Sequence, residues 1–300
     1  MQNTKTIHQE LQSQRISVLN DKIILISDFF IDDFVGGAAL NDEEIYSTLS
    51  QHYDVQKIKS RYLYPGFIHE NLESFFIISN FFLINPYLLK TIQEKCNYIL
   101  YCHDYKFVKH TNPAVYPDFI VPSNELINVG IHKNAQAIIC QTGFQKDIYD
   151  RNLKLPDKTI NFSGNLWSDD HLNLLEELDR IEKDFNKCAI VESPYPQKGT
   201  EYSKQYCQQN NIPFDIIKHP DYESFLKILS EYSSLAFHPS TPETCCRLVL
   251  EAKMIGLKIY TNKLIGASYE PWYELNGTPL INAMRDKKKD LLQIIRNVRR

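Results

Sequence analysis

The sequence predicts an α/β protein of two domains, each built on a parallel sheet. Short apolar runs alternate with segments of helical spacing along most of the chain, which is the pattern of doubly wound sheets. The length of 300 residues corresponds to about two domains. The composition, with 43% hydrophobic and 23% charged residues, is ordinary for a globular chain.

The net charge, the cysteines and the apolar stretches indicate which partners and which locations the protein can have. The formal net charge of −4 leaves no global basic field that would recruit nucleic acid. Seven scattered cysteines without a Cys-x-x-Cys pair favour reduced thiols and a cytoplasmic location. Residues 1–15 are polar and lack the apolar core of a secretory signal. The longest apolar stretch, residues 75–89, is interrupted by Asn and Pro and is too short to span a bilayer.

The first half of the chain opens with a clear strand signal. Residues 22–28 form a continuous apolar run bounded by charge, as expected of a buried parallel strand. Residues 41–44 are polar and acidic and predict the start of a helix to about residue 51, capped by Asn41 or Asp42. The other elements predicted here are strands at 54–60, 74–84, 97–105 and 135–140 and helices at 86–95, 123–132 and 145–151.

The second half repeats this alternation. An acidic helix at 172–185 precedes a strand at 187–193. Aromatic and leucine side chains recur at helical spacing over 221–232, which predicts an amphipathic helix packed on a sheet. The other predicted elements are strands at 214–218, 234–237 and 257–260, helices ending near 208 and before 256, and a basic tail helix at 287–300.

Residues 238–256 carry the most chemical information. They read as a strand end, a turn and a helix, with Glu243 at the turn and Glu251 seven intervening residues later. The N–H groups at such a helix start suit a phosphate, and a carboxylate beyond it can accept two hydrogen bonds from a ribose diol. Two structural alternatives stay open: Glu243 completes a capping box with Ser240, or Glu251 is a solvated helix residue.

The stretch Ser-x-x-Glu, seven residues, then Glu-Ala-x-x-x-Gly resembles the Glu-x7-Glu element of retaining GT-B glycosyltransferases, especially glycosyltransferase family 4. The resemblance implies the GT-B fold, in which two Rossmann-like domains face a central cleft. It also implies that Glu243 approaches the donor-sugar hydroxyls and that Glu251 holds the nucleotide ribose.

Three further matches extend the resemblance. A Gly36-Gly37-Ala loop after the first strand would face the donor phosphates and the acceptor, and His103-Asp104 ends a strand where the family has a site His. On local grounds alone, the stronger interpretation of His103 is a structural histidine held by an acid. Lys198-Gly199 resembles the family's Lys-Gly, whose lysine contacts the donor diphosphate.

One position departs from the family pattern. Relatives usually carry an Arg five residues before the lysine, and this chain has Ser193 there. We expect Arg247 to supply the second phosphate-binding cation, unless it only forms a salt bridge with a nearby acid. The predicted catalytic residues are Glu243, His103 and Lys198, and the predicted substrate-binding residues are Gly36, Gly37, Asp104, Thr244, Cys245, Cys246, Arg247 and Glu251.

The resemblance also divides the chain into an acceptor-side domain (1–164), a donor-side domain (165–285) and a tail helix (286–300). The tail has six Lys or Arg against two Asp. It is expected either to pack back on the first domain, as in GT-B folds, or to contact an anionic membrane surface that carries a lipid-linked acceptor.

The implied reaction is the transfer of a sugar, with retention, from a nucleotide-diphosphate sugar to a hydroxyl of a glycan, a lipid-linked or a small-molecule acceptor. No Asp-x-Asp motif is present, so neither a metal nor another cofactor is expected. Two alternatives share the fold. One is a nucleotide- or glycan-binding protein without turnover, and the other is a sugar-nucleotide epimerase.

Overall fold

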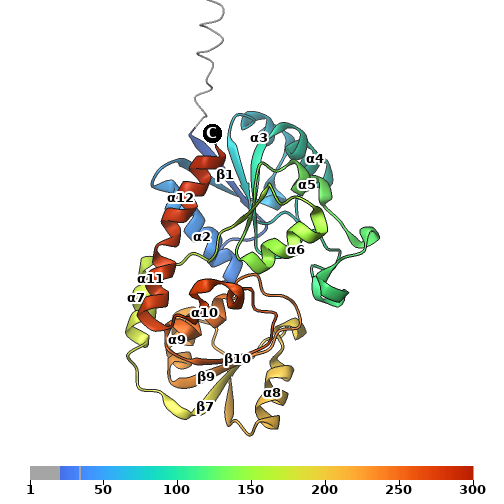
Figure 1. Ribbon diagram of the computed structural model, residues 1–300. Helices are drawn as coiled ribbons and strands as arrows, with labels where there is room; N and C mark the ends of the chain where they lie inside the picture. Colours follow the sequence, from blue (N-terminus) through green and yellow to red (C-terminus); the bar gives the residue numbers. More distant parts are fainter. Residues whose placement is uncertain (1–20, 34, 300) are drawn as a thin grey trace, which may run out of the picture.

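The computed structural model describes residues 21–33 and 35–299, so the predicted polar segment 1–15 lies outside the described residues. The chain forms two α/β domains stacked along the long axis of the molecule (Figure 1). Each contains one parallel sheet with helices on both faces, as the sequence predicts. Among the described residues, no helix has the length and apolar character needed to cross a membrane.

The first domain is built on a parallel sheet of six described strands in the order β2-β1-β3-β4-β5-β6. Its strands are β1 (Lys22–Ser27), β2 (Asp54–Lys59), β3 (Phe75–Ile78), β4 (Asn97–Cys102), β5 (Ile138–Cys140) and β6 (Thr159–Asn161). Its α-helices are α2 (Gly37–Ser50), α3 (Pro65–Glu70), α4 (Pro86–Lys95), α5 (Val129–Asn134) and α6 (Gly143–Leu153). Short 3-10 helices lie at η1 (Ser60–Tyr62), η2 (Pro113–Val115), η3 (Pro117–Phe119) and η4 (Ser123–Glu125).

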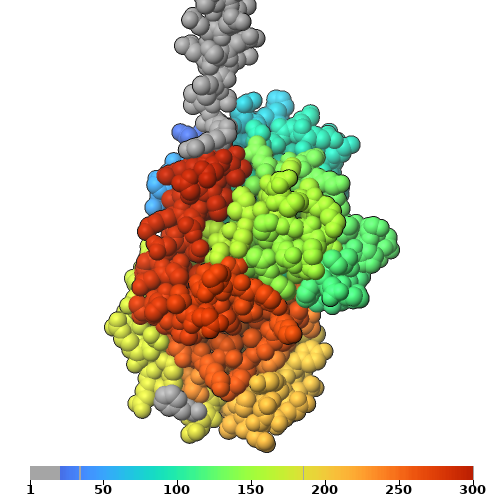
Figure 2. Space-filling model, viewed as in Figure 1, coloured from blue at the N-terminus to red at the C-terminus, as the bar shows by residue number. Residues whose placement is uncertain are grey.

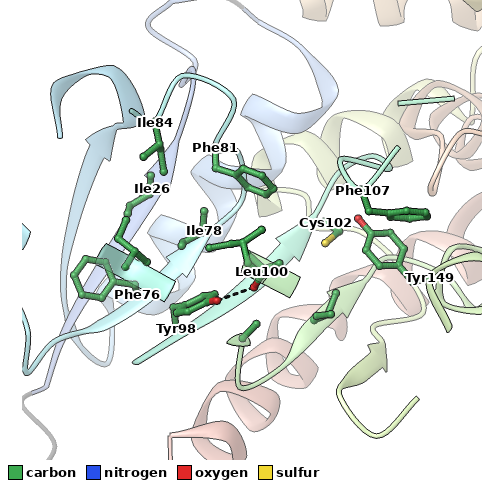
Figure 3. Close-up of a cluster of buried hydrophobic side chains, with 14 of the residues drawn as sticks. Ile26, Phe76, Ile78, Phe81, Ile84, Tyr98, Leu100, Cys102, Phe107 and Tyr149 are labelled. Carbon is green, nitrogen blue, oxygen red and sulfur yellow. Dashed lines mark hydrogen bonds between the residues drawn. The ribbon is translucent and has the colours of Figure 1, made fainter. Parts of the chain in front are cut away.

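Two apolar clusters enclose this sheet. On one face, Ile26, Phe76 and Leu100 pack with the buried rings of the loop after β4 (Figure 3). The hydroxyl of Tyr98 donates to the Ile131 carbonyl oxygen at 2.7 Å, so this polar group is satisfied inside the core. Burial on both faces explains why these strands read as continuous apolar runs.

The second domain has four described parallel strands in the order β10-β9-β7-β8. They are β7 (Asp184–Val191), β8 (Phe214–Ile217), β9 (Tyr232–Phe237) and β10 (Lys258–Thr261). The helices are α7 (Asp169–Leu178), α8 (Thr200–Gln209), α9 (Tyr222–Ser230), α10 (Arg247–Met254) and α11 (Gly277–Arg285), with short 3-10 helices η5 (Pro196–Lys198), η6 (Gly266–Tyr269) and η7 (Pro271–Glu274).

The last helix, α12 (Lys287–Val298), returns to the first domain. It runs alongside α2, and Leu291 and Ile295 join the apolar cluster that contains Ile23 and Leu25 of β1 (Figure 1). In Figure 2 this C-terminal segment lies on the surface and extends from the second domain onto the first. Lys288 strengthens the junction, because its Nζ lies 3.7 Å from Glu44 and 3.3 Å from Asp169.

Several elements differ from the predictions. The strands predicted at 74–84, 97–105 and 135–140 are shorter, at 75–78, 97–102 and 138–140. Helix α2 begins at Gly37 rather than near residue 41, because Asn41 and Asp42 are buried by tertiary partners instead of capping the helix. The helix predicted at 123–132 is broken, since Asn128 has a left-handed backbone with φ +53°. The acidic helix ends at Leu178 instead of 185, because Asp184 already pairs with Tyr232 in the sheet.

We predict that Leu291→Ala lowers the free energy of unfolding by about 2–5 kcal/mol, because it leaves a cavity where α12 meets the first domain. Urea denaturation measures this loss. Gln293→Ala, on the exposed side of the same helix, is the control and should change stability by no more than about 0.5 kcal/mol. Equal stability of the two variants would contradict the packing of α12 described here.

Candidate functional site

A cavity of about 280 Å³ lies between the two domains, beyond the carboxyl ends of β7 and β9. Ligands of open parallel sheets gather at this edge. The cavity is lined by Gly37, Val191, Glu192, Ser193, Lys198, Phe237, Glu243, Cys246, Arg247 and Leu248. Five of the predicted site residues, Gly37, Lys198, Glu243, Cys246 and Arg247, therefore meet in one place.

Lys198 and Glu243 form an ion pair in this cavity. The Nζ atom of Lys198 lies 2.7 Å from Oε1 of Glu243, and the two side chains are 42% and 18% exposed. Burial lowers the pKa of Lys198, but attraction by Glu243 and the hydrogen bond to it outweigh burial, so its pKa is raised. The lysine therefore stays charged at neutral pH.

The backbone that carries Lys198 requires a glycine. Gly199 has φ +72°, and a Cβ atom added there would lie 1.8 Å from the carbonyl oxygen of His238. Only glycine permits this conformation together with this close approach. Helix α8 begins at the next residue, Thr200, whose hydroxyl accepts a hydrogen bond from the backbone N–H of Ser193 at 3.2 Å. Gly199 thus permits the turn that places Lys198 at the cavity, and Thr200 ties this turn to the end of β7.

Glu243 is held by its backbone outside any helix. Its N–H donates to the Leu264 carbonyl oxygen at 2.8 Å, and its own carbonyl oxygen accepts from the Gly266 N–H at 2.8 Å. Helix α10 begins only at Arg247, after Cys246 in a left-handed conformation with φ +64°. Glu243 is therefore not part of a capping box, and its carboxylate is available to the cavity.

The two cysteines between Glu243 and α10 are buried. Burial raises the pKa of the Cys245 thiol, and it raises the pKa of the Cys246 thiol well above its usual value. Both side chains are therefore neutral thiols at neutral pH. Among the predicted substrate-binding residues, Cys246 lines the cavity, and Cys245 packs in the core of the second domain.

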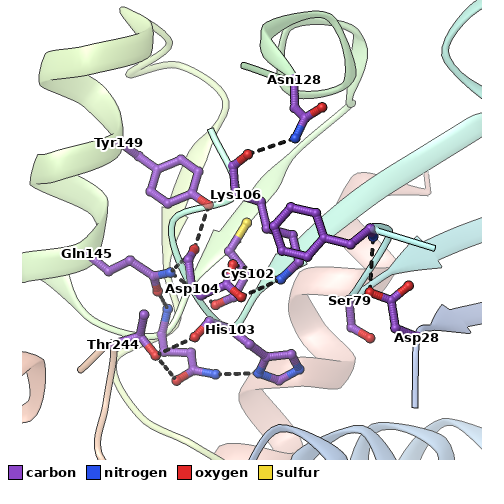
Figure 4. Close-up of polar contacts among 12 residues, drawn as sticks. Asp28, Ser79, Cys102, His103, Asp104, Lys106, Asn128, Gln145, Tyr149 and Thr244 are labelled. Carbon is purple, nitrogen blue, oxygen red and sulfur yellow. Dashed lines mark hydrogen bonds and ion pairs between the residues drawn. The ribbon is translucent and has the colours of Figure 1, made fainter. Parts of the chain in front are cut away.

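Thr244 joins the two domains. Its hydroxyl lies 2.9 Å from Oε1 of Gln141 and 3.1 Å from the carbonyl oxygen of His103. Its own carbonyl oxygen accepts a hydrogen bond from the hydroxyl of Thr142 at 2.7 Å. The residue after Glu243 is therefore fixed against the carboxyl ends of β4 and β5 (Figure 4).

His103 lies in a buried polar network and is only 6% exposed. Its Nε2 atom is 2.7 Å from Oδ1 of Asp42, whose Oδ2 accepts from the Ser79 hydroxyl at 2.7 Å. Its Nδ1 atom is 2.9 Å from the amide nitrogen of Gln141. Because Gln141 donates to Nδ1 and accepts from Thr244, the network assigns the ring proton to Nε2, which donates to Asp42.

Asp104, the sequence neighbour of His103, has a different partner. Both its carboxylate oxygens lie 2.7 Å from Nζ of Lys106, which is buried beside Phe81 and Phe82 (Figure 4). Its backbone oxygen accepts from the hydroxyl of Tyr149 at 2.8 Å. The adjacent His and Asp of the sequence are therefore not partners in the fold.

Arg247 and Glu251 pair one helical turn apart on α10. Nε of Arg247 lies 2.9 Å from Oε1 of Glu251, and Nη1 donates to the Leu166 carbonyl oxygen at 2.5 Å. The indole N–H of Trp167 and the hydroxyl of Tyr222 both donate to the same carboxylate oxygen, the former at 2.9 Å. Glu251 is thus a buried counter-charge and not a solvated helix residue.

The glycine pair lies at the start of α2. Gly36, in an extended conformation with φ −150°, precedes the helix, and Gly37 is its first residue. Gly37 lines the cavity beside Arg247: a Cβ atom added to Gly37 would lie 3.8 Å from Cδ of Arg247. This is ordinary van der Waals contact, so the packing against Arg247 would tolerate a Cβ atom. Gly37 thus brings the start of α2 to the cavity, and the free N–H groups at a helix start suit an anion.

Sequence reasoning missed several residues of this arrangement: Asp42, Ser79, Gln141, Trp167 and Tyr222. Four of them carry no local motif, and the fifth, Asp42, reads as a helix cap. In residues 21–33 and 35–299, no group of three or more His, Cys, Asp or Glu side chains is placed to hold a metal ion.

The chain matches no protein-family profile, and no protein of curated function is significantly similar to it in sequence. Its fold is similar to solved structures. HepE of Anabaena in complex with UDP-glucose has a TM-score of 0.51 and 12% identity, over 92% of this chain and 98% of that one.

The catalytic domain of starch synthase IV from Arabidopsis thaliana, bound to ADP and acarbose, has a TM-score of 0.53 and 12% identity, over 93% of this chain and 94% of that one. A UDP-forming trehalose-phosphate synthase from Burkholderia xenovorans has a TM-score of 0.51 and 9% identity, over 93% and 96% of the two chains. At these identities the likeness establishes the fold: two Rossmann-like domains in the GT-B arrangement.

We predict that Thr244→Val lowers the free energy of unfolding by about 1–3 kcal/mol, because it removes the single O–H donor that the buried oxygens of Gln141 and His103 share. Thr244→Ser keeps the hydroxyl and should lose less. Urea denaturation of both variants measures the difference. A loss in Thr244→Val that is no larger than the loss in Thr244→Ser would contradict the contribution assigned to the hydrogen bonds between the domains.

Proposed function

We propose that this chain is a retaining glycosyltransferase, which moves a sugar from a nucleotide-diphosphate sugar to a hydroxyl group of an acceptor. The observation that supports this most directly is the Lys198–Glu243 ion pair, which places a cation and a carboxylate in one cavity between two Rossmann-like domains. A cation suits a departing diphosphate, and a carboxylate suits sugar hydroxyls. Proteins of similar fold have been solved with UDP-glucose and with ADP, which supports a nucleotide-sugar donor.

In the proposed reaction, negative charge grows on the diphosphate while the sugar becomes cation-like. Lys198 and Arg247, which line the cavity together with Cys246, stabilise that charge along with the N–H groups of residues 244–246. Glu243 accepts hydrogen bonds from the sugar hydroxyls and so orients the anomeric carbon. The leaving phosphate takes the proton of the acceptor hydroxyl, so no side-chain nucleophile is assigned.

The acceptor is proposed to bind on the first-domain side of the cavity. Gly36 and Gly37 form the approach to it at the start of α2. His103 shapes this side because it holds Gln141, which in turn holds Thr244. Asp104, after the end of β4, has a more exposed carboxylate than Asp42, the partner of His103. The proposed acceptor is a hydroxyl group of a glycan, of a lipid-linked molecule or of a small molecule.

Location and metal use complete the proposal. All seven cysteines are free thiols, which supports a cytoplasmic location. Metal independence is part of the proposal, and the lack of an Asp-x-Asp motif in the sequence supports it. A peripheral membrane contact through residues 287–300 would compete with the ion pairs that Lys287, Lys288 and Lys289 form with carboxylates of the same protein.

Ser193 favours a second candidate, a nucleotide- or glycan-binding protein without turnover. It lines the cavity at the place where the resembled family carries a cation. Calorimetric nucleotide binding without sugar transfer or donor hydrolysis would favour this candidate. Mass spectrometry of the products separates a transferase from a sugar-nucleotide epimerase.

We predict that a panel of UDP-, GDP- and ADP-sugars contains at least one donor that raises the melting temperature. A ligand at a hundred times its dissociation constant adds about 2.7 kcal/mol to the stability of the folded state. Differential scanning fluorimetry identifies this donor. A panel without any shift would contradict the proposed donor site.

With that donor, Lys198→Ala is expected to lower turnover by roughly a hundredfold, because it removes a preorganised positive charge beside the departing diphosphate. Glu243→Ala is expected to lower turnover by at least about tenfold. Lys204→Ala is the matched control, since Lys204 lies on α8 and pairs with the exposed Glu201 at 2.6 Å. Near-normal transfer by both site variants would contradict the assignment of Lys198 and Glu243 to the active site.

A further inference from the structure

One carboxylate oxygen of Glu251, Oε1, is surrounded by donors from this chain. Its side chain is 3% exposed, and its Oε1 atom receives the indole N–H of Trp167 at 2.9 Å and the hydroxyl of Tyr222. The Nε atom of Arg247 lies 2.9 Å from the same oxygen. A ribose diol that took over this oxygen would leave buried donors without a partner, which is costly.

Arg247 is fixed on several sides. Its guanidinium carbon lies 4.4 Å from the centre of the Trp167 ring, and its Nη1 atom donates to the Leu166 carbonyl oxygen at 2.5 Å. The residue is buried and also lines the cavity. The guanidinium therefore has one orientation, set by the segment that crosses between the domains and by Glu251.

A buried guanidinium needs a counter-charge, because an unpaired charge in the interior is strongly destabilising. Glu251 supplies this charge from the same helix, on the side of Arg247 that packs against Trp167 and Tyr222. A cation that is held in place before the ligand arrives loses little conformational freedom on binding. Ser193 provides no charge across the cavity, so Arg247 and Lys198 are the two basic side chains among the described residues that line it.

We infer that Glu251 is a positioning residue, which holds Arg247 toward a bound diphosphate and does not bind the ribose. The ribose role is the one that the family resemblance implies, so the two roles can be compared directly. The inference rests on the proposed function for the identity of the ligand as a nucleoside diphosphate.

The test compares three probes by isothermal titration calorimetry: inorganic pyrophosphate, UDP or ADP (whichever the wild type binds), and its 2′-deoxy analogue. Glu251→Gln is expected to weaken pyrophosphate binding by about tenfold or more, because Arg247 loses its counter-charge and its orientation. The affinity ratio between the ribose and 2′-deoxyribose forms is expected to stay at the wild-type value. If Glu251 instead bound the ribose, Glu251→Gln would change the affinity ratio and leave pyrophosphate binding at the wild-type value.

A double-mutant cycle separates positioning from a general loss of structure. Arg247→Gln should weaken pyrophosphate as Glu251→Gln does, and Glu251→Gln should add little in the Arg247→Gln background. Glu176→Gln is the matched control, because Glu176 pairs with Arg180 at 3.7 Å on the surface of α7 and should leave all three affinities unchanged. Additive losses from Arg247 and Glu251 would overturn the inference.

The folded fraction of each variant is checked by far-UV circular dichroism. If Glu251→Gln does not fold, Glu251→Asp keeps the charge but shortens the side chain, and it should weaken pyrophosphate while preserving the ribose preference. Loss of the ribose preference in either variant overturns the inference, as does a wild-type protein that does not bind pyrophosphate. Pyrophosphate binding without any nucleotide binding would instead contradict the proposed function and leave the role of Glu251 standing.

Discussion

The arrangement of the cavity depends on how residues 243–247 are held between the two domains. Thr244 is bonded through its hydroxyl and its carbonyl oxygen to the strand ends of the first domain. On the other side, the backbone of Glu243 is paired with the segment before η6. The chain therefore crosses the interface in an irregular conformation and enters α10 only at Arg247. Glu243, which precedes the helix, and Arg247, its first residue, both line the cavity.

The parallel sheets could be predicted because burial on both faces produces continuous apolar runs, as in β1. Lys198 and Glu243 could be found from short motifs. The partners of Glu251 could not, because Trp167 and Tyr222 lie 84 and 29 residues away and have no motif of their own. Asp42 shows the limit of local rules: an acidic residue near a helix start reads as a cap, but here tertiary contacts with His103 and Ser79 decide its place.

Buried polar groups gather where the two domains meet. The network of Asp42, His103 and Gln141 and the pair of Arg247 and Glu251 both lie at this interface. Glu270 adds a third contact, since its two oxygens accept from the Gly143 N–H and the Ser163 hydroxyl, each at 2.5 Å. Apolar residues would stabilise a contact of this kind as well as, or better than, paired charges. The polar groups add a directional constraint that apolar contacts lack, because hydrogen bonds fix the relative positions of the groups that line the cavity.

The two ion pairs also indicate the order of binding events in the proposed reaction. Without ligand, Glu243 holds Lys198, and Glu251 holds Arg247, so each cation already has a partner. The two carboxylates differ in access, because Glu243 is partly exposed and Glu251 is enclosed by Trp167 and Tyr222. A bound diphosphate can therefore replace Glu243 as the partner of Lys198, whereas Arg247 stays paired with Glu251 when it contacts the diphosphate. In the proposed reaction, the arrival of the diphosphate therefore releases Glu243, and its carboxylate becomes free for the sugar hydroxyls only when the donor that carries them is bound.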